Sequence, residues 1–135
     1  MKKIEKILKN KNYRIFYLYE YCDWGARHYN YSKIVKYKAL PGSIIVKLTY
    51  FPYGHGSQWS TRETLVFVPQ NTPIPTAQMK YFTQDWALLE KRPEPKVSKT
   101  EIILEEISTT KAMEIYESYL VYPEEKISIE VEKVK

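Results

Sequence analysis

The chain has 135 residues, of which 44% are hydrophobic, and a formal net charge of +5. This composition is typical of a folded domain rather than a disordered segment, and no apolar run approaches the ~18 residues of a membrane-spanning helix. Cys22 is the single cysteine, which excludes an internal disulfide and a thiolate metal cluster. We therefore expect one domain over residues 1–135, with no cofactor, metal or membrane contact. The expected location is the cytoplasm, or the host cytoplasm or virion if the protein is viral.

The first part of the chain predicts a short helix followed by a β-meander. Ile4, Ile7 and Leu8 recur at helical spacing within residues 2–10. Four segments rich in strand-forming residues follow within residues 12–69, namely 13–22, 31–40, 43–51 and 59–68. Pro41-Gly42 is a strong turn signal because proline presets φ and glycine accepts a positive φ. The short connections predict that these four strands pair in sequence as an antiparallel meander.

The second part, residues 74–135, predicts a mixture of helix and strand. After Pro73 and Pro75, the apolar residues from Met79 to Leu89 recur at helical spacing, so we expect a helix over residues 76–91. A stiff charged linker is expected at residues 91–96. Residues 100–107 fit a strand or the opening of a longer helix, and we favour the strand.

A helix is expected near residues 110–121, with Ala112, Ile115, Tyr116 and Tyr119 directed inward. Residues 126–132 alternate between apolar and polar side chains, as in a strand with one wet face. The predicted fold class is therefore α+β. It has an antiparallel sheet of a four-stranded meander plus one or two C-terminal strands, and two amphipathic helices packed on one face.

Aromatic and basic residues crowd the segment 12–31, NYRIFYLYEYCDWGARHYNY. In a strand over residues 13–22 the tyrosines share one face, while Phe16, Leu18, Glu20 and Cys22 share the other. If the phenylalanine face is core, the tyrosines form an open ladder on which bases can stack. If the tyrosine face is core, the rings are buried and their hydroxyls need partners. The pattern leaves both alternatives open.

The second strand does not decide between them. Tyr31 and Lys33 fall on one face, and Lys36 and Lys38 on the other. Both faces mix apolar and basic residues.

Charge is distributed unevenly along the chain. Residues 1–62 contain twelve Lys/Arg and three Asp/Glu, a balance of +9, whereas residues 63–135 contain nine and thirteen, a balance of −4. Such asymmetry points to a polyanionic partner for the basic half, or to attraction between the two halves within the fold.

Our leading hypothesis is a non-enzymatic protein that binds single-stranded DNA or RNA through a basic, aromatic sheet face. The motifs of RNA-recognition and cold-shock folds are absent, so the analogy with them is physical only. The expected phosphate-binding and base-stacking residues are Arg14, Tyr17, Tyr19, Tyr21, Arg27, Tyr29, Tyr31, Lys33, Lys36, Lys38, Lys47 and Trp59.

Two alternatives belong to other classes. The first is a small viral or plasmid-encoded interaction protein whose tyrosine face docks onto a protein partner or a second copy of itself. The second is a metal-independent nuclease in which His28 and His55 act as acid and base on one phosphate. That mechanism requires both imidazoles to converge, and nothing in the sequence forces them together.

Overall fold

The computed structural model describes residues 2–24, 28–38, 41–56, 59–85 and 96–135, and it describes side chains for residues 4–21, 41–56, 59–81 and 100–135. The statements below concern these residues. The helices are α1 (Lys2–Lys9) and α2 (Thr109–Leu120), with a 3-10 turn at Glu124–Lys126. The strands are β1 (Tyr13–Trp24), β2 (His28–Lys38), β3 (Ile44–Tyr50), β4 (Trp59–Pro69), β5 (Thr76–Asp85), β6 (Lys96–Ile103), β7 (Glu105–Ile107) and β8 (Ile127–Lys133).

The fold class is α+β with antiparallel strand pairing, as predicted, but the meander order is wrong. The strands are arranged in the order β6-β5-β2-β1-β4-β3-β8, and β7 pairs with β1. β1 pairs with β4 from Tyr13↔Pro69 to Asp23↔Trp59, whereas its pairing with β2 is limited to Cys22–Trp24. β1 and β4 carry apolar residues on both faces, so burial of those faces places them side by side. Short loops between consecutive strands are therefore not sufficient to predict which strands are neighbours in the sheet.

The prediction of a helix over residues 76–91 is also wrong for residues 76–85, the part of it that the structure describes. Thr76–Asp85 is a strand that pairs with β2 on one side and β6 on the other. Ala77 and Met79 are buried while Gln78 is exposed, which is the two-residue alternation of a strand. The rest of that predicted helix, and most of the predicted linker at 91–96, lie outside the described residues.

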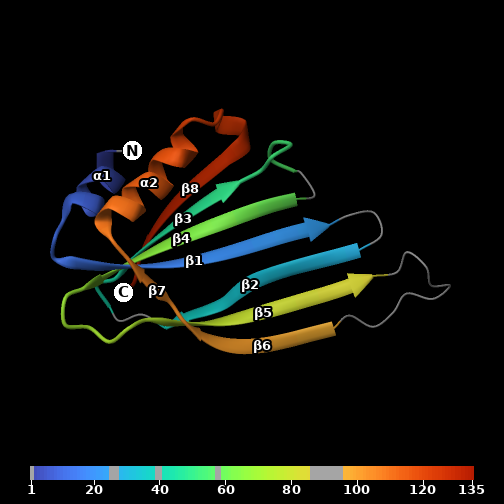
Figure 1. Ribbon diagram of the computed structural model, residues 1–135, viewed down its shortest axis with the longest axis horizontal. Coiled ribbons are helices and arrows are strands. Elements are labelled where there is room, and N and C mark those ends of the chain that lie inside the picture. Colours follow the sequence, from blue (N-terminus) through green and yellow to red (C-terminus); the bar gives the residue numbers. More distant parts are fainter. Residues whose placement is uncertain (1, 25–27, 39–40, 57–58, 86–95) are drawn as a thin grey trace.

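The sheet separates into two layers at the end nearest the helices. β1, β4, β3 and β8 form a helix-side layer, and β2, β5 and β6 form an outer layer. β1 and β2 lie together at their tips and diverge toward that end, where β7 instead of β2 pairs with β1 (Figure 1). Phe16, Val66 and Val68 of the helix-side layer cluster with Ala77 of β5 and with Leu104 beyond β6. This cluster holds the two layers together.

A second core lies on the opposite face of the helix-side layer. Both helices are on the side of β8, β3 and β4, away from β6 (Figure 1). The predicted inward residues of α2 are all buried, and they share a cluster with Ile4, Ile7 and Leu8 of α1 and with β3 and β4. Ile127, Ile129 and Val131, the apolar residues of the alternating segment 126–132, pack against the same cluster. Gly42 has a φ of +94°, as the turn prediction required.

Removal of the N-cap of α2 should lower the free energy of unfolding by about 1 kcal/mol. Ser108 Oγ accepts a hydrogen bond from the backbone N–H of Lys111 at 3.0 Å. Urea unfolding of Ser108→Ala tests this. Ser118→Ala is the matched control, because Ser118 Oγ donates to the carbonyl of Ile115 inside the helix, whose carbonyls already have helical partners. Equal losses in both variants would contradict the capping role.

Candidate functional site

The tyrosine face of β1 is buried at one end and open at the other. Ile15 is buried, and Tyr13 and Tyr17 pack against the helix-side core. Further along the strand, Tyr19 is 48% exposed and Tyr21 is 38% exposed. Neither alternative from the sequence therefore holds for the whole strand, because the helices cover only its first half.

Glu63 of β4 ties this face to helix α2. Tyr17 Oη donates to Glu63 Oε2 at 2.6 Å, and Tyr119 Oη donates to Glu63 Oε1 at 2.8 Å. Burial, followed by these hydrogen bonds to the carboxylate, raises the pKa of Tyr17 and of Tyr119. Tyr17 is thus a structural residue in a three-residue network, which makes it unavailable for stacking on a base.

The raised tyrosine pKa values predict a loss of stability in alkaline solution. The fold favours the neutral phenols, so their contribution is complete below the ordinary pKa of 10.0 and declines as the pH rises from there toward the folded-state pKa values. Between pH 9 and 11 the natural chain should lose about 1–2 kcal/mol more than the Tyr17→Phe/Tyr119→Phe variant, the smaller share coming from the more accessible Tyr17. Urea unfolding across this range measures the difference. Parallel pH profiles would contradict it.

The exposed aromatic residues lie beside carboxylates. Tyr19 is directly opposite Glu63, and Trp59, 38% exposed, is opposite Asp23 in the same β1–β4 pairing. Directly opposed residues share a face of the sheet. Tyr19, Tyr21 and Trp59 therefore lie on an acidic face, which repels phosphates.

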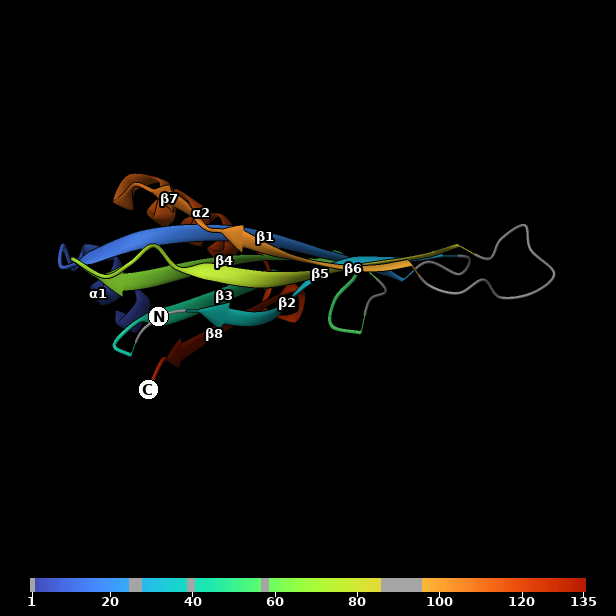
Figure 2. The same ribbon diagram turned by 90° about the horizontal axis from the view of Figure 1, so that it is seen from below.

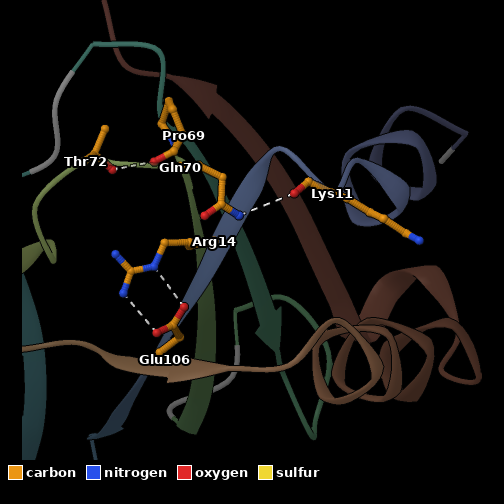
Figure 3. A network of polar contacts seen from close by, with 6 residues as sticks. All are labelled: Lys11, Arg14, Pro69, Gln70, Thr72 and Glu106. Carbon is orange, nitrogen blue, oxygen red and sulfur yellow. Dashed lines mark hydrogen bonds and ion pairs between the residues drawn. The ribbon is translucent and has the colours of Figure 1, made fainter.

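Two of the predicted phosphate-binding residues have carboxylate partners. Arg14 Nε and Nη2 each donate to Glu106 at 3.0 Å, across the β1–β7 pairing (Figure 3). These hydrogen bonds raise the pKa of Arg14 and lower the pKa of Glu106. Lys47 Nζ lies 3.8 Å from Glu132 of β8. Both pairs join the basic half of the chain to the acidic half, which supports the alternative that the two halves attract each other.

Further polar contacts near Arg14 hold the segment that follows β4 (Figure 3). Gln70 Nε2 donates to the carbonyl of Lys11 at 3.4 Å, and Thr72 Oγ1 donates to the carbonyl of Pro69 at 2.7 Å. These bonds hold the chain as it leaves β4 and passes toward the outer layer.

The remaining predicted residues of β2 are brought together by an irregularity in that strand. Lys33 is opposite Lys80, Ile34 opposite Met79, and Lys36 opposite Gln78, so the register shifts at residue 35. This bulge moves Lys36 and Lys38 to the face that carries Lys33, which corrects the sequence-based assignment to opposite faces. Tyr29 and Tyr31 belong to this face as well, opposite Gln84 and Phe82. Arg27 lies outside the described residues.

We call this surface the lysine face. By register and strand alternation it consists of Tyr29, Tyr31, Lys33, Lys36 and Lys38 of β2, Thr76, Gln78, Lys80, Phe82 and Gln84 of β5, and Val97, Lys99, Glu101 and Ile103 of β6. Lys33, Lys80 and Lys99 form a row across the three strands. The set contains five lysines and one glutamate. The β5 members are missed because the sequence pattern predicts a helix over residues 76–91. The β6 members are missed because they fall where the predicted linker at 91–96 meets the predicted strand at 100–107.

Along the first part of β5 the lysine face is the outer face of its layer, whereas further along Tyr81 on the opposite face is 40% exposed. On β5 the opposite face is buried at Ala77 and Met79, 1% and 2% exposed, whereas Gln78 is exposed and Lys80 half-buried. On β6, Glu101 is exposed, and its Oε1 accepts a hydrogen bond from Thr76 Oγ1 at 3.1 Å. The outer layer lies along the lower margin of Figure 1 and is therefore nearest the reader in Figure 2.

The imidazole of His55 contacts its own chain on two sides. Its Nε2 is 3.0 Å from the carbonyl oxygen of Ile127, and its ring lies 4.4 Å from that of Phe51. The Cα of His28 is opposite that of Asp85 at the start of β2, and its side chain is not described. The nuclease hypothesis therefore stays a prediction.

The described residues contain no group of three or more His, Cys, Asp and Glu residues able to hold a metal ion. No helix among them is long and apolar enough to cross a membrane. Comparison with models of protein families, with curated proteins and with solved structures finds no match to this chain.

Proposed function

We propose that this protein binds single-stranded nucleic acid on the lysine face. The observation that carries the proposal is the row of Lys33, Lys80 and Lys99 across three paired strands. Like charges directly opposite each other destabilise a sheet. A polyanion lying across the strands would neutralise this row, and Lys36 and Lys38 extend the positive charge along β2.

The aromatic residues of the same face favour a single strand over a duplex. Tyr29, Tyr31 and Phe82 occupy neighbouring positions of β2 and β5, toward the end at which β1 and β2 lie together. Aromatic rings on a sheet stack on unpaired bases, and each stacked base contributes about 1–3 kcal/mol. In a duplex the faces of the bases are occupied by neighbouring base pairs. The predicted class of ligand and the predicted residues of β2 are thus kept, the residues of β1 are left out, and residues of β5 and β6 are added.

Fluorescence anisotropy with labelled single-stranded DNA and RNA, and with a duplex of the same sequence, tests the proposal. We expect tighter binding of the single strands. With five lysines neutralising phosphates, the logarithm of the binding constant should fall by about 3.5 per tenfold increase in salt. Absence of binding at low salt would remove the proposal. Equal affinity for duplex and single strand would remove the stacking role of the aromatic residues.

A further inference from the structure

Strand β8 forms one margin of the sheet, opposite β6 (Figure 1). Within the part of the chain that the structure describes, its partner is β3 alone. β8 is a regular seven-residue strand, and an edge strand of this kind is a template for pairing with another strand. We propose that two copies of this protein pair antiparallel through their β8 edges.

The hydrogen-bond phase shows which backbone groups face outward. Phe51 N donates to the carbonyl of Lys126 at 2.7 Å, and Val134 N donates to the carbonyl of Ser43 at 2.9 Å. In an antiparallel pair every second residue of a strand hydrogen-bonds to the same neighbour through its backbone N–H and C=O groups. The even-numbered residues of β8 therefore form the backbone hydrogen bonds to β3. The backbone N–H and C=O groups of Ile129 and Val131 therefore point away from β3. The carbonyl of Ile127 also points away from β3 and lies 3.0 Å from His55 Nε2, so in the dimer the N–H of the partner's Val131 would take the place of this imidazole.

One antiparallel register makes this edge complementary to itself. When Ile129 faces Ile129 of the partner subunit, Ile127 faces the partner's Val131 and Ser128 faces the partner's Glu130. In the same register Lys126 faces the partner's Glu132, and Glu125 faces the partner's Lys133. Each opposition except the central one occurs twice by symmetry. Apart from Ser128 with Glu130, the oppositions are then apolar with apolar and basic with acidic.

A register centred on Ser128 also sets Lys126 against an acidic residue, the partner's Glu130, but it places Glu132 against the partner's Glu124. The registers on the other side of Ile129 have no such compensation. A pairing centred on Glu130 places that carboxylate against its own copy, and one centred on Val131 places Glu130 against the partner's Glu132. Like charges directly opposite are destabilising. The charge pattern of β8 therefore selects the register centred on Ile129, and it argues for a second copy of the chain as the occupant of the edge.

Apolar exposure on the helix side of this edge supports the same pairing. Ile127, Ile129 and Val131 are only half-buried although they pack against the helix-side core. Val121, just beyond α2, is 78% exposed, and the following Tyr122 stacks on Tyr50, whose Cα partner in β8 is Ile127. Pairing of the two β8 strands would cover the open flank of the helix-side core in both copies. This inference does not depend on nucleic-acid binding.

Charge reversal tests the register. Sedimentation equilibrium of the natural chain should give a mass of twice 16.1 kDa at high protein concentration. Lys126→Glu should raise the dissociation constant of the dimer about tenfold, because it places like charges opposite twice. Glu132→Lys should also raise it, but it removes the contact of Glu132 with Lys47 of its own chain as well, so Lys126→Glu carries the comparison. The Lys126→Glu/Glu132→Lys double variant should restore the natural value. A monomeric natural chain, or single variants that dimerise as well as it does, would overturn the proposal.

Cysteine cross-linking tests the pairing directly, in a Cys22→Ser background. Ile129→Cys should form an intermolecular disulfide with oxidised glutathione, since Cα atoms of a hydrogen-bonded antiparallel pair lie about 5.5 Å apart. Val131→Cys is the matched control on the same face. In this register the two Val131 residues are offset by four positions, about 13 Å, and should not cross-link. Equal cross-linking of both variants, or of neither, would overturn the register.

Discussion

Replacement of Lys33, Lys80 and Lys99 by glutamine is expected to weaken binding of single-stranded nucleic acid about 100-fold at ~100 mM salt. Each lysine that contacts a phosphate contributes on the order of 1 kcal/mol or more, and three such losses correspond to this factor. The salt dependence should become shallower by about 2 log units per tenfold change in salt. Anisotropy titrations at several salt concentrations measure both quantities.

The same triple variant should be slightly more stable than the natural chain. Its row of opposed lysines disappears, and relief of like-charge cross-strand pairs contributes a few tenths to about 1 kcal/mol. A matched control replaces Lys9, Lys11 and Lys111, which are exposed residues outside the lysine face, with the same change in net charge. Equal weakening of binding by both triple variants would show that net charge, rather than the lysine face, determines affinity.

Phe16→Ala is expected to lower the free energy of unfolding by about 3–5 kcal/mol, the largest loss of stability that we predict. Phe16 is 1% exposed and lies in the cluster that joins the helix-side layer to the outer layer. The guanidinium of Arg14 also lies over this ring, with its Cζ 5.2 Å from the ring centroid. Loss of the ring leaves a cavity between two stacked sheet layers, which the sheet backbones cannot close.

Hydrogen exchange locates the damage. Phe16→Ala should accelerate exchange in β5 around Ala77 and Met79, because that strand loses its packing against the helix-side layer. Phe67→Ala is the control, since Phe67 is equally buried but belongs to the core shared with the helices. It should accelerate exchange in α1 and α2 instead. The same exchange pattern in both variants would contradict the separation into two cores.

Local patterns predicted the elements whose burial follows a single period. In α2, the spacing of Ala112, Ile115, Tyr116 and Tyr119 identified both the helix and its buried face. In β8, alternation identified the strand and the residues that pack on the core. The predictions for α2 and β8 are correct because each element has a single apolar face. Only one orientation of such an element buries that face in the core.

Local patterns failed where an element has neighbours on both sides. In β5, the spacing of Met79 and Phe82 suggested a helix, yet pairing with β2 and β6 makes the segment a strand. Backbone hydrogen bonds to both neighbours, together with burial of Ala77 and Met79, outweigh the helical spacing. The bulge at residue 35 was hidden for the same reason, because a register shift exists only relative to a partner strand.

The sequence by itself determined the fold class, the basic character of the first half, and most helix and strand boundaries. The tertiary structure decided which faces those strands share. Tyr19 and Tyr21 lie with Glu63 on one face, Arg14 and Lys47 pair with carboxylates, and Lys33, Lys36 and Lys38 join Lys80 on the outer face of the sheet. The physical reason is that a charge on a strand acts on whatever lies across the sheet from it. Strand order, register and bulges set those neighbours, and they arise from contacts between residues far apart in the chain.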